Sequence, residues 1–326
     1  MAHRICVVQA APVVLDRTAS LHKICKLTAE AAEQGAKLVI FPEAFVPTYP
    51  FWVWYLAARE HTRLAELHGE LVDQAVSIPG PELAPVQDAA RRAGVYVALG
   101  VSERNAEASA TSLFNTVVLI GPDGEVVAKH RKLVPTGPER LVWAQGDGST
   151  LAPVATPLGR VAALICWENY MPLARYALYA QGVDLLMAPT YDEGETWQCS
   201  VRHIAKEGRI YVASASMVLH REHVPEAHGL AALVSDREWI KQGDSVIAAP
   251  SGSLIAGPLH GQEGILYAEI DARDVAGSRW NLDVAGHYAR PDLFQFALRR
   301  QTQAPMTIQN APSSVEVEDP GTTELK

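Results

Sequence analysis

The sequence has few of the features that mark secreted, membrane-spanning or nucleic-acid-binding proteins. It contains only four cysteines in 326 residues, and their irregular spacing gives neither a disulfide framework nor a paired-cysteine zinc pattern. No segment typical of a signal peptide precedes the first strand-like run. We therefore expect a cytoplasmic protein. No apolar run approaches the ~20 residues that a bilayer-spanning helix needs, so we expect no membrane partner.

Positive charge is also scarce. The 28 Lys and Arg residues are outnumbered by 37 Asp and Glu, which gives a formal net charge of −9 at pH 7. With no basic run to counter this balance, nucleic acid is excluded as the main partner. Neither a GxxxxGK(S/T) phosphate loop nor a dinucleotide fingerprint is present, which predicts no cofactor. His220, His223 and His228 lack a carboxylate or cysteine partner at a matching spacing, so no metal site is predicted.

The chain does contain what a large folded core requires, because 48% of its residues are hydrophobic. Strand-like and helix-like segments alternate along it. Strands are predicted at 4–10, 37–41, 95–101, 113–120, 125–129, 151–155, 160–166, 184–188, 210–217, 245–249, 253–256 and 264–271. Helices are predicted at 18–34, 82–93, 172–181 and 198–208. Turn signals at 121–124 and 156–159 add hairpins to the strand–helix units, which predicts two mixed sheets in one layered α/β domain.

Domain boundaries follow from composition. We expect residues 1–300 to form a single catalytic domain. From about Gln301 the chain is rich in Gln, Pro, Ser and Thr and poor in large apolar residues, so 301–326 is predicted to be an extended or disordered tail. The segment His220–Gly243 lacks clear periodicity and is predicted to be a surface insertion with apolar residues available for oligomer contacts.

One cysteine stands at a position that favours chemistry. The apolar run Val161–Ile165 is typical of a buried strand, and Met171-Pro172 starts a helical pattern. Cys166 therefore lies at the C-terminal end of a strand. In α/β folds reactive groups gather at such ends, where backbone N–H groups can stabilise developing negative charge. A cysteine inside a strand, such as Cys6, is usually a small buried hydrophobe, whereas Cys166 is a candidate nucleophile.

Two further strand exits carry ionisable residues. Glu43 follows the apolar run Leu38–Phe41, and Lys132 follows the strand predicted at 125–129. Taken alone, such a glutamate is most often a solvated loop charge or helix cap, and such a lysine is most often on the surface. Strand exits within one sheet tend to share an edge, however, so we expect Glu43, Lys132 and Cys166 to meet.

The motifs around these residues resemble those of the nitrilase superfamily of carbon–nitrogen hydrolases, in order and spacing, over roughly residues 4–295. The matching motifs are Phe41–Glu43, His130–Thr136, Cys166–Pro172, Arg202–Arg209 and Gly286–Pro291. Cys-Trp-Glu-Asn at 166–169, together with the motif at 286–291, points to the true nitrilase branch. The resemblance implies a four-layer αββα sandwich of two mixed sheets flanked by helices. It also implies a homo-oligomer that dimerises through helices and often extends into spirals.

The chemistry of the three residues fits this resemblance. A thiol is only a few per cent ionised at neutral pH, so Cys166 needs a base, and Glu43 can supply one. Lys132 can stabilise negative charge that develops on a nitrile nitrogen. The resemblance adds Glu139 as the family's second glutamate, which positions Lys132 and the substrate. It also predicts that the pocket is formed by Tyr49, Trp54, Thr136, Trp143 and Trp167.

The leading prediction is an enzyme that hydrolyses an organic nitrile, its small-molecule substrate, to the carboxylic acid and ammonia. The alternatives are an amidase that uses the same thiol, a cyanide-degrading relative, or a non-catalytic assembly protein on this fold. Aromatic residues at 49–55 argue against a substrate as small as cyanide. A non-catalytic protein has no need of Glu43, Lys132 and Cys166 together.

Overall fold

A computed structural model describes residues 1–302 of the chain; the tail predicted for 301–326 lies almost wholly outside the described residues. Six strands form the first sheet in the spatial order β13 (Gly264–Ile270), β1 (His3–Gln9), β2 (Leu38–Ile40), β3 (Tyr96–Arg104), β4 (Leu113–Ile120) and β5 (Val126–Arg131). The second sheet runs β10 (Val218–His220), β11 (Trp239–Ala248), β9 (Tyr211–Ser214), β8 (Leu185–Met187), β7 (Gly159–Ala163) and β6 (Val154–Thr156), with β12 (Leu254–His260) paired to β11.

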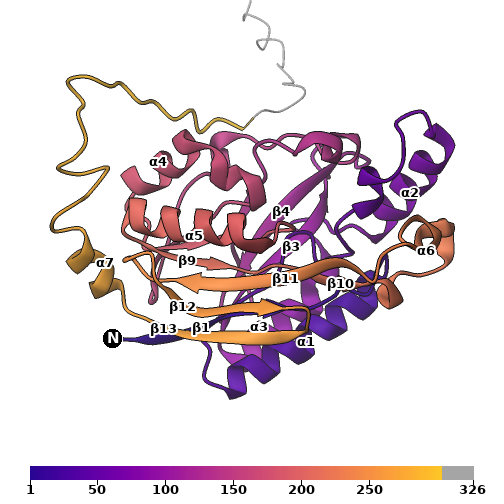
Figure 1. Ribbon diagram of the computed structural model, residues 1–326, viewed down its shortest axis with the longest axis horizontal. Helices are drawn as coiled ribbons and strands as arrows, with labels where there is room; N and C mark the ends of the chain where they lie inside the picture. The colour runs from indigo at the N-terminus through magenta and orange to yellow at the C-terminus, as the bar shows by residue number, and fades with distance from the viewer. Residues whose placement is uncertain (303–326) are drawn as a thin grey trace, which may run out of the picture.

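The two sheets stack face to face, and helices cover their outer faces (Figure 1). Side chains in a strand alternate between faces, and β1 shows the consequence. Cys6 and Val8 pack with helices α1 (Arg17–Glu33) and α3 (Ala84–Ala93), while Ile5 and Val7 pack against the second sheet. Helices α4 (Pro172–Ala180) and α5 (Gly194–Gly208) cover the far side. The predicted four-layer αββα sandwich is therefore confirmed.

Both sheets are mixed, as predicted. β1, β2 and β3 run parallel, as do β7, β8 and β9, and the remaining neighbours pair antiparallel. The turn signals at 121–124 and 156–159 form the β4–β5 and β6–β7 hairpins. Because β4 is antiparallel to both β3 and β5, strand β5 points the same way as β2. The residues that follow β2 and β5 therefore emerge at one edge.

Two parts of the fold differ from the expectations. Helix α2 (His61–Gln74) was not predicted, because its buried face consists of only Leu67 and Leu71. The segment predicted as a surface insertion, His220–Gly243, differs only at its ends, which belong to β10 and β11 of the second sheet, while most of the residues between these strands are exposed, as predicted. Its short helix α6 (Leu230–Leu233) lies beside α2 at one end of the molecule (Figure 1).

The apolar residues of this segment are used inside the chain. Leu230 is fully buried and Ile240 is 8% exposed, in a cluster shared with α2 and the aromatic residues around 49–56. Leu230 and Ile240 are therefore not available for the oligomer contact for which the sequence suggested them, whereas Leu233 and Trp239 are half-buried. The short C-terminal helix α7 (Ala272–Ser278) completes the chain's helices as far as residue 302. In that same part of the chain, no helix is long and apolar enough to cross a membrane.

A glycine in β3 sets how closely the loop after β2 can approach. A Cβ atom placed on Gly100 would lie 2.2 Å from the carbonyl oxygen of Pro42 and 2.6 Å from the backbone nitrogen of Ala44. Both contacts are to backbone, which cannot swing aside as a flexible side chain can. The position of Glu43, between Pro42 and Ala44, therefore depends on the absence of a side chain at residue 100.

We predict that Gly100→Ala destabilises the protein by about 1–3 kcal/mol or more, because overpacking forces backbone to move. Denaturant unfolding followed by circular dichroism measures this. The matched control is Gly69→Ala in α2, where an added Cβ meets nothing within 4 Å. It should stabilise the helix by about 0.5–1 kcal/mol. A Gly100→Ala protein as stable as the parent would show that the loop is not held by this contact.

Candidate active site

Cys166 begins a turn of 3-10 helix, η5 (Cys166–Tyr170), directly beyond the C-terminal end of β7. Its φ is +52°, in the left-handed region that non-glycine residues rarely occupy and that often marks functional sites. Its backbone N–H donates to the carbonyl of Pro189, 2.9 Å away, which ties the turn to the segment after β8. The side chain lies at the base of a pocket and is 5% exposed.

Glu43 follows β2 and is completely buried. Its Oε1 accepts hydrogen bonds from Lys132 Nζ at 2.8 Å and from Asn115 Nδ2 at 2.7 Å. Its Oε2 accepts from the backbone N–H of Tyr191 at 2.8 Å. The carboxylate is thus held by three hydrogen-bond donors, from β4, from the residue after β5 and from the loop after β8.

Lys132, one residue past the end of β5, lies between two carboxylates. Its Nζ donates to Glu43 Oε1 and to Glu139 Oε2, both at 2.8 Å. Glu139 belongs to the 3-10 turn η3 (Gly137–Leu141), capped by Thr136, whose backbone N–H donates to Glu139 Oε2 at 2.7 Å. Tyr49 Oη donates to Glu139 Oε1 at 2.7 Å. The structure therefore brings Glu43, Lys132 and Glu139 into one hydrogen-bonded cluster, and Cys166 interacts electrostatically with it.

Burial and charge shift the pKa values of this cluster. Burial raises the pKa of the Glu43 carboxyl above its ordinary 4.5, the Lys132 ammonium opposes that shift, and Glu139 reinforces it. Burial alone would lower the pKa of Lys132, but the charges of Glu43, Cys166 and Glu139 outweigh it and raise that pKa. Lys132 is therefore a permanent cation. Burial also raises the pKa of the Cys166 thiol, with Glu43 adding to the rise and Lys132 opposing it, so the thiol keeps its proton until a base takes it.

A second buried carboxylate holds the nucleophile's turn in place. Glu168 accepts from the backbone N–H groups of Leu133 and Ile165, each at 2.6 Å. His130 Nε2 lies 3.1 Å from both of its oxygens. Glu168 thus joins the strand exit that carries Lys132 to the turn that carries Cys166. No role for Glu168 was predicted from the sequence, although this residue lies inside the Cys-Trp-Glu-Asn motif.

The pocket above this cluster encloses about 420 Å³, and six of its fourteen lining residues are aromatic. Four of the five predicted pocket residues line it: Tyr49, Trp54, Thr136 and Trp167. Trp143 does not. It is buried behind Tyr49, edge-on to that ring at 5.5 Å between centroids, and its Nε1 donates to Ser102 Oγ. The prediction for Trp143 was therefore wrong in position, because the ring supports the pocket wall from behind.

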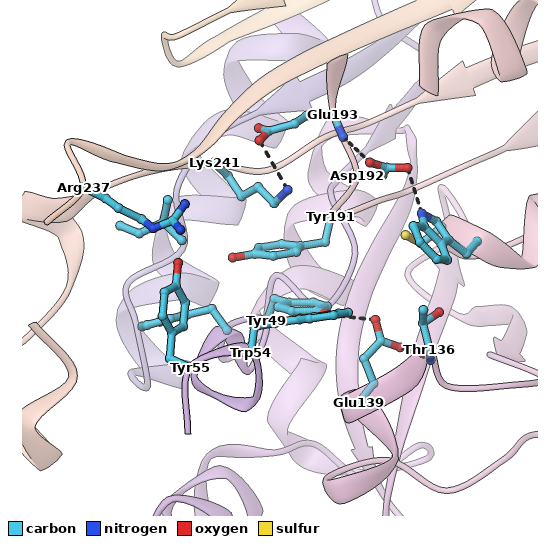
Figure 2. Close-up of a pocket in the computed structure, with 14 residues that line it drawn as sticks. Tyr49, Trp54, Tyr55, Thr136, Glu139, Tyr191, Asp192, Glu193, Arg237 and Lys241 are labelled. Atoms are coloured by element: carbon cyan, nitrogen blue, oxygen red, sulfur yellow. Dashed lines mark hydrogen bonds and ion pairs between the residues drawn. The ribbon is translucent and has the colours of Figure 1, made fainter. Parts of the chain in front are cut away.

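Several pocket residues were missed from the sequence. Tyr191 stacks on Tyr49 with ring centroids 3.6 Å apart and planes 6° apart, and Figure 2 shows the two residues next to one another in the pocket wall. The other missed lining residues are Phe51, Tyr55, Asp192, Glu193, Arg237, Ile240 and Lys241. Tyr191 and its two successors follow the strand β8, so the strand-exit argument would have found them. Arg237 and Lys241 gave no local signal because they enter the site through tertiary folding alone.

Nothing in this cluster is arranged for a metal. The two carboxylates that converge, Glu43 and Glu139, are bridged by the Lys132 ammonium. Within residues 1–302 no group of three or more His, Cys, Asp or Glu side chains could hold a metal ion. His220, His223 and His228 are placed apart from the pocket lining, and His220 packs its ring on Trp239 at 4.8 Å between centroids.

Known proteins resemble this chain over most of its length. A family profile described as "Carbon-nitrogen hydrolase" matches residues 4–279. An aliphatic nitrilase of Sinorhizobium fredii (strain HH103) is 41% identical over 304 residues, which cover 92% of this chain and 97% of that protein. A bifunctional nitrilase/nitrile hydratase of Lupinus angustifolius is 37% identical over 324 residues, 96% of this chain and 90% of that protein. A solved carbon-nitrogen hydrolase from Helicobacter pylori G27 shares the fold at a TM-score of 0.68 and 19% identity, covering 90% of this chain and 97% of its own.

The chain belongs to the carbon-nitrogen hydrolase family. Within that family it belongs to the nitrilase branch, since its relatives at 37–41% identity over nearly their whole length are nitrilases. The resemblance inferred from the motifs is confirmed.

The raised pKa of Glu43 predicts how catalysis depends on pH. If Glu43 is the base, protonating it removes activity, so kcat/KM should fall as the pH drops through that raised pKa. We therefore expect the acidic limb of the profile to have its midpoint above 4.5, the ordinary value for a glutamate. Rates across the pH range, with circular dichroism to verify folding, test this. Full activity of the folded protein down to pH 4.5 would remove Glu43 as the titrating base.

Proposed function

We propose that this protein is a nitrilase, which converts an organic nitrile and two water molecules to a carboxylic acid and ammonia. The observation that carries the proposal is the buried Glu43–Lys132–Glu139 cluster beside Cys166 at the base of an aromatic pocket. The nitrilases to which the chain is similar support it. In this proposal Cys166, Glu43, Lys132 and Glu139 are the catalytic residues.

The first half of the reaction forms a covalent thioimidate. Glu43 accepts the thiol proton as Cys166 Sγ attacks the nitrile carbon, and one π bond of the C≡N group becomes a lone pair on nitrogen. That nitrogen is protonated by the acid form of Glu43. The Lys132 ammonium stabilises the negative charge that develops on the nitrogen. Its raised pKa keeps the side chain charged for this role.

The second half releases both products. Glu43 takes a proton from a water that adds to the thioimidate carbon and passes it to the nitrogen. The hydroxyl proton of the resulting tetrahedral intermediate then moves to the same nitrogen, which leaves as ammonia while the carbonyl of a thioester forms. A second water, activated in the same way, cleaves the thioester to the carboxylic acid and restores the thiol. The backbone N–H of Trp167, next to the nucleophile, supplies a second donor to the oxyanion. Glu139 accepts hydrogen bonds from the Lys132 ammonium and from the Tyr49 hydroxyl.

The same intermediate allows a second product. If the tetrahedral intermediate expels the thiol in place of ammonia, the product is the amide R–CO–NH2. One relative is a bifunctional nitrilase/nitrile hydratase, so the ratio of acid to amide should be measured. Incubation with aliphatic, aryl and arylaceto-nitriles, scored for acid, amide and ammonia, tests the proposal. A protein that releases ammonia only from carboxamides would be an amidase. The 420 Å³ aromatic pocket favours substrates larger than cyanide.

We also propose a cytoplasmic homo-oligomer whose catalytic domain is residues 1–300. Four free cysteines support a reducing compartment. Exposed apolar side chains support self-association, with Trp280, Leu173 and Phe294 at 80%, 67% and 74% exposure.

The role of Cys166 is tested by removing its sulfur. We predict that Cys166→Ala abolishes turnover while the thermal midpoint changes little, because a small thiol at the base of a pocket contributes little packing. The matched control is Cys199→Ala, since Cys199 is exposed on α5 and absent from the pocket lining; it should keep the parent rate. Substantial nitrile hydrolysis by folded Cys166→Ala would reject the mechanism.

The base and the cation are tested separately. We predict that Glu43→Gln and Lys132→Met each lower kcat by about 10²–10⁴-fold, the first by removing the base and the second by removing the charge that stabilises the developing anion. Lys129→Met is the control, because Lys129 lies on β5 and pairs with Glu103 outside the pocket. We expect the kcat of this variant to stay within tenfold of the parent value. If either the Glu43 or the Lys132 variant kept a kcat within tenfold of the parent value, that residue would not be catalytic.

Light scattering tests the assembly. We expect a dimer or larger, and we expect deletion of 301–326 to leave nitrile turnover within tenfold of the parent. A monodisperse, fully active monomer would contradict the oligomer, and total loss of activity on truncation would contradict the domain boundary.

A further inference from the structure

The pocket has two chemically different ends. Thr136 and Glu139 lie at the end nearest the reacting cluster, while Arg237 and Tyr55 lie at the opposite end (Figure 2). Tyr191 lies between them, so both ends belong to one continuous cavity. A substrate that places its cyano carbon at Cys166 and fills this cavity must reach the distal end with its other terminus.

The middle of the cavity suits an apolar spacer. The stacked rings of Tyr49 and Tyr191 form one wall. Their neighbour Trp54 donates its Nε1 hydrogen to Tyr49 Oη at 3.0 Å, and that hydroxyl in turn donates to Glu139. The Tyr49 hydroxyl and the Trp54 N–H are therefore already hydrogen-bonded, and in the middle of the cavity the wall offers a ligand ring surface.

The other charged residues that line the cavity above the reacting cluster are already neutralised or hydrogen-bonded. Asp192 accepts from Trp167 Nε1 at 2.8 Å. Glu193 accepts from the backbone N–H of Gln242 at 2.6 Å and lies 3.4 Å from Lys241 Nζ. The ammonium of Lys241 also lies over the Tyr191 ring, 4.7 Å from its centroid. These two acids and one cation hold each other in the wall.

Arg237 is different, because no carboxylate within residues 1–302 forms an ion pair with it. Its guanidinium lies over the ring of Tyr55, 5.6 Å from the centroid. Asp236 and Glu238 flank it in the sequence but do not line the pocket. The hydroxyls of Tyr55 and Tyr191 also form no hydrogen bond within the described chain, and Figure 2 shows both on the Arg237 side. A guanidinium and two free hydroxyl donors therefore gather at the distal end.

We propose that this distal end binds an anionic group, so that the preferred substrates are nitriles carrying a carboxylate separated from the cyano group by an apolar spacer. The inference rests on the nitrilase function proposed above. Arg237 is then a specificity-determining residue, whose planar fork of N–H donors matches a carboxylate. The alternative is that Arg237 is only a solvated surface charge stacked on Tyr55.

The test compares two matched series of substrates. One series is ω-cyano carboxylates, NC–(CH2)n–COO⁻, of increasing n; the other is the methyl ketones NC–(CH2)n–CO–CH3, which have the same shape without the charge. Ammonia release gives kcat and KM for each. We expect at least one chain length at which the carboxylate has a KM about tenfold lower than its ketone, the size of a single charged hydrogen-bonded contact.

Substitution identifies the residue responsible. Arg237→Met should bring the two KM values of that pair to within about twofold. Arg59→Met is the matched control, because Arg59 is an exposed cation close to Tyr55 in the sequence but outside the pocket lining; it should keep the parent ratio. The parent ratio should also shrink at high salt, since a partly exposed charge is screened.

Two results would overturn the proposal. Equal KM values for carboxylate and ketone at every chain length, with the ketone nitriles hydrolysed, would reject the anionic subsite and leave the nitrilase function standing. If the folded Arg237→Met variant kept the parent ratio of ketone KM to carboxylate KM, Arg237 would not be the residue that binds the carboxylate. Failure to hydrolyse either series and every aliphatic, aryl and arylaceto-nitrile would instead reject the nitrilase function on which the subsite rests.

Discussion

The structure around the site depends on one interaction, the Lys132 ammonium held between the carboxylates of Glu43 and Glu139. Taking three charges out of water is costly, and their mutual attraction compensates only when the remaining hydrogen-bonding positions are also satisfied. The fold meets that requirement from several elements: Asn115 of β4 and the Tyr191 N–H bind Glu43, while Tyr49 and the Thr136 N–H bind Glu139. The strand exits, the 3-10 turn at 137–141 and the aromatic segment near residue 50 are thus fixed by the same charge cluster.

That cluster also divides the chemical roles between its members. Burial and the second carboxylate raise the pKa of Glu43, so it can accept a proton from a thiol more readily than a solvated glutamate could. The two carboxylates keep Lys132 charged, so it supports catalysis as a fixed cation. Glu168 adds a second connection, because it accepts hydrogen bonds from the backbone of the segment after Lys132 and of the segment before Cys166. It therefore fixes the positions of these two segments relative to each other. Base, cation and nucleophile are preorganised before any substrate arrives.

Much of this could be predicted from the sequence, and the failures have physical causes. The alternation of strand-like and helix-like segments and the two hairpin turns predicted the sheets, and the strand-exit argument found Glu43, Lys132 and Cys166, because these signals are local. Helix α2 was missed because only two of its residues are buried. β10 and the first half of β11 were missed because their pairing includes a register shift at Leu219/His220, whereas the second half of β11 falls in the strand predicted at 245–249. Trp143 was wrongly predicted to line the pocket, and Arg237 was not predicted to line it. Both errors have the same cause, because packing between segments distant in sequence decides which side chains face the pocket.

The central claim is that Cys166 forms a covalent bond to the nitrile carbon. Its most direct test is rapid acid quenching of the enzyme during turnover, followed by intact-protein and peptide mass spectrometry. The account predicts an added mass equal to the whole nitrile for the thioimidate, or to the acyl group for the thioester, on the peptide that contains Cys166. Nitrile hydrolysis at the parent rate with the adduct on another residue would contradict it.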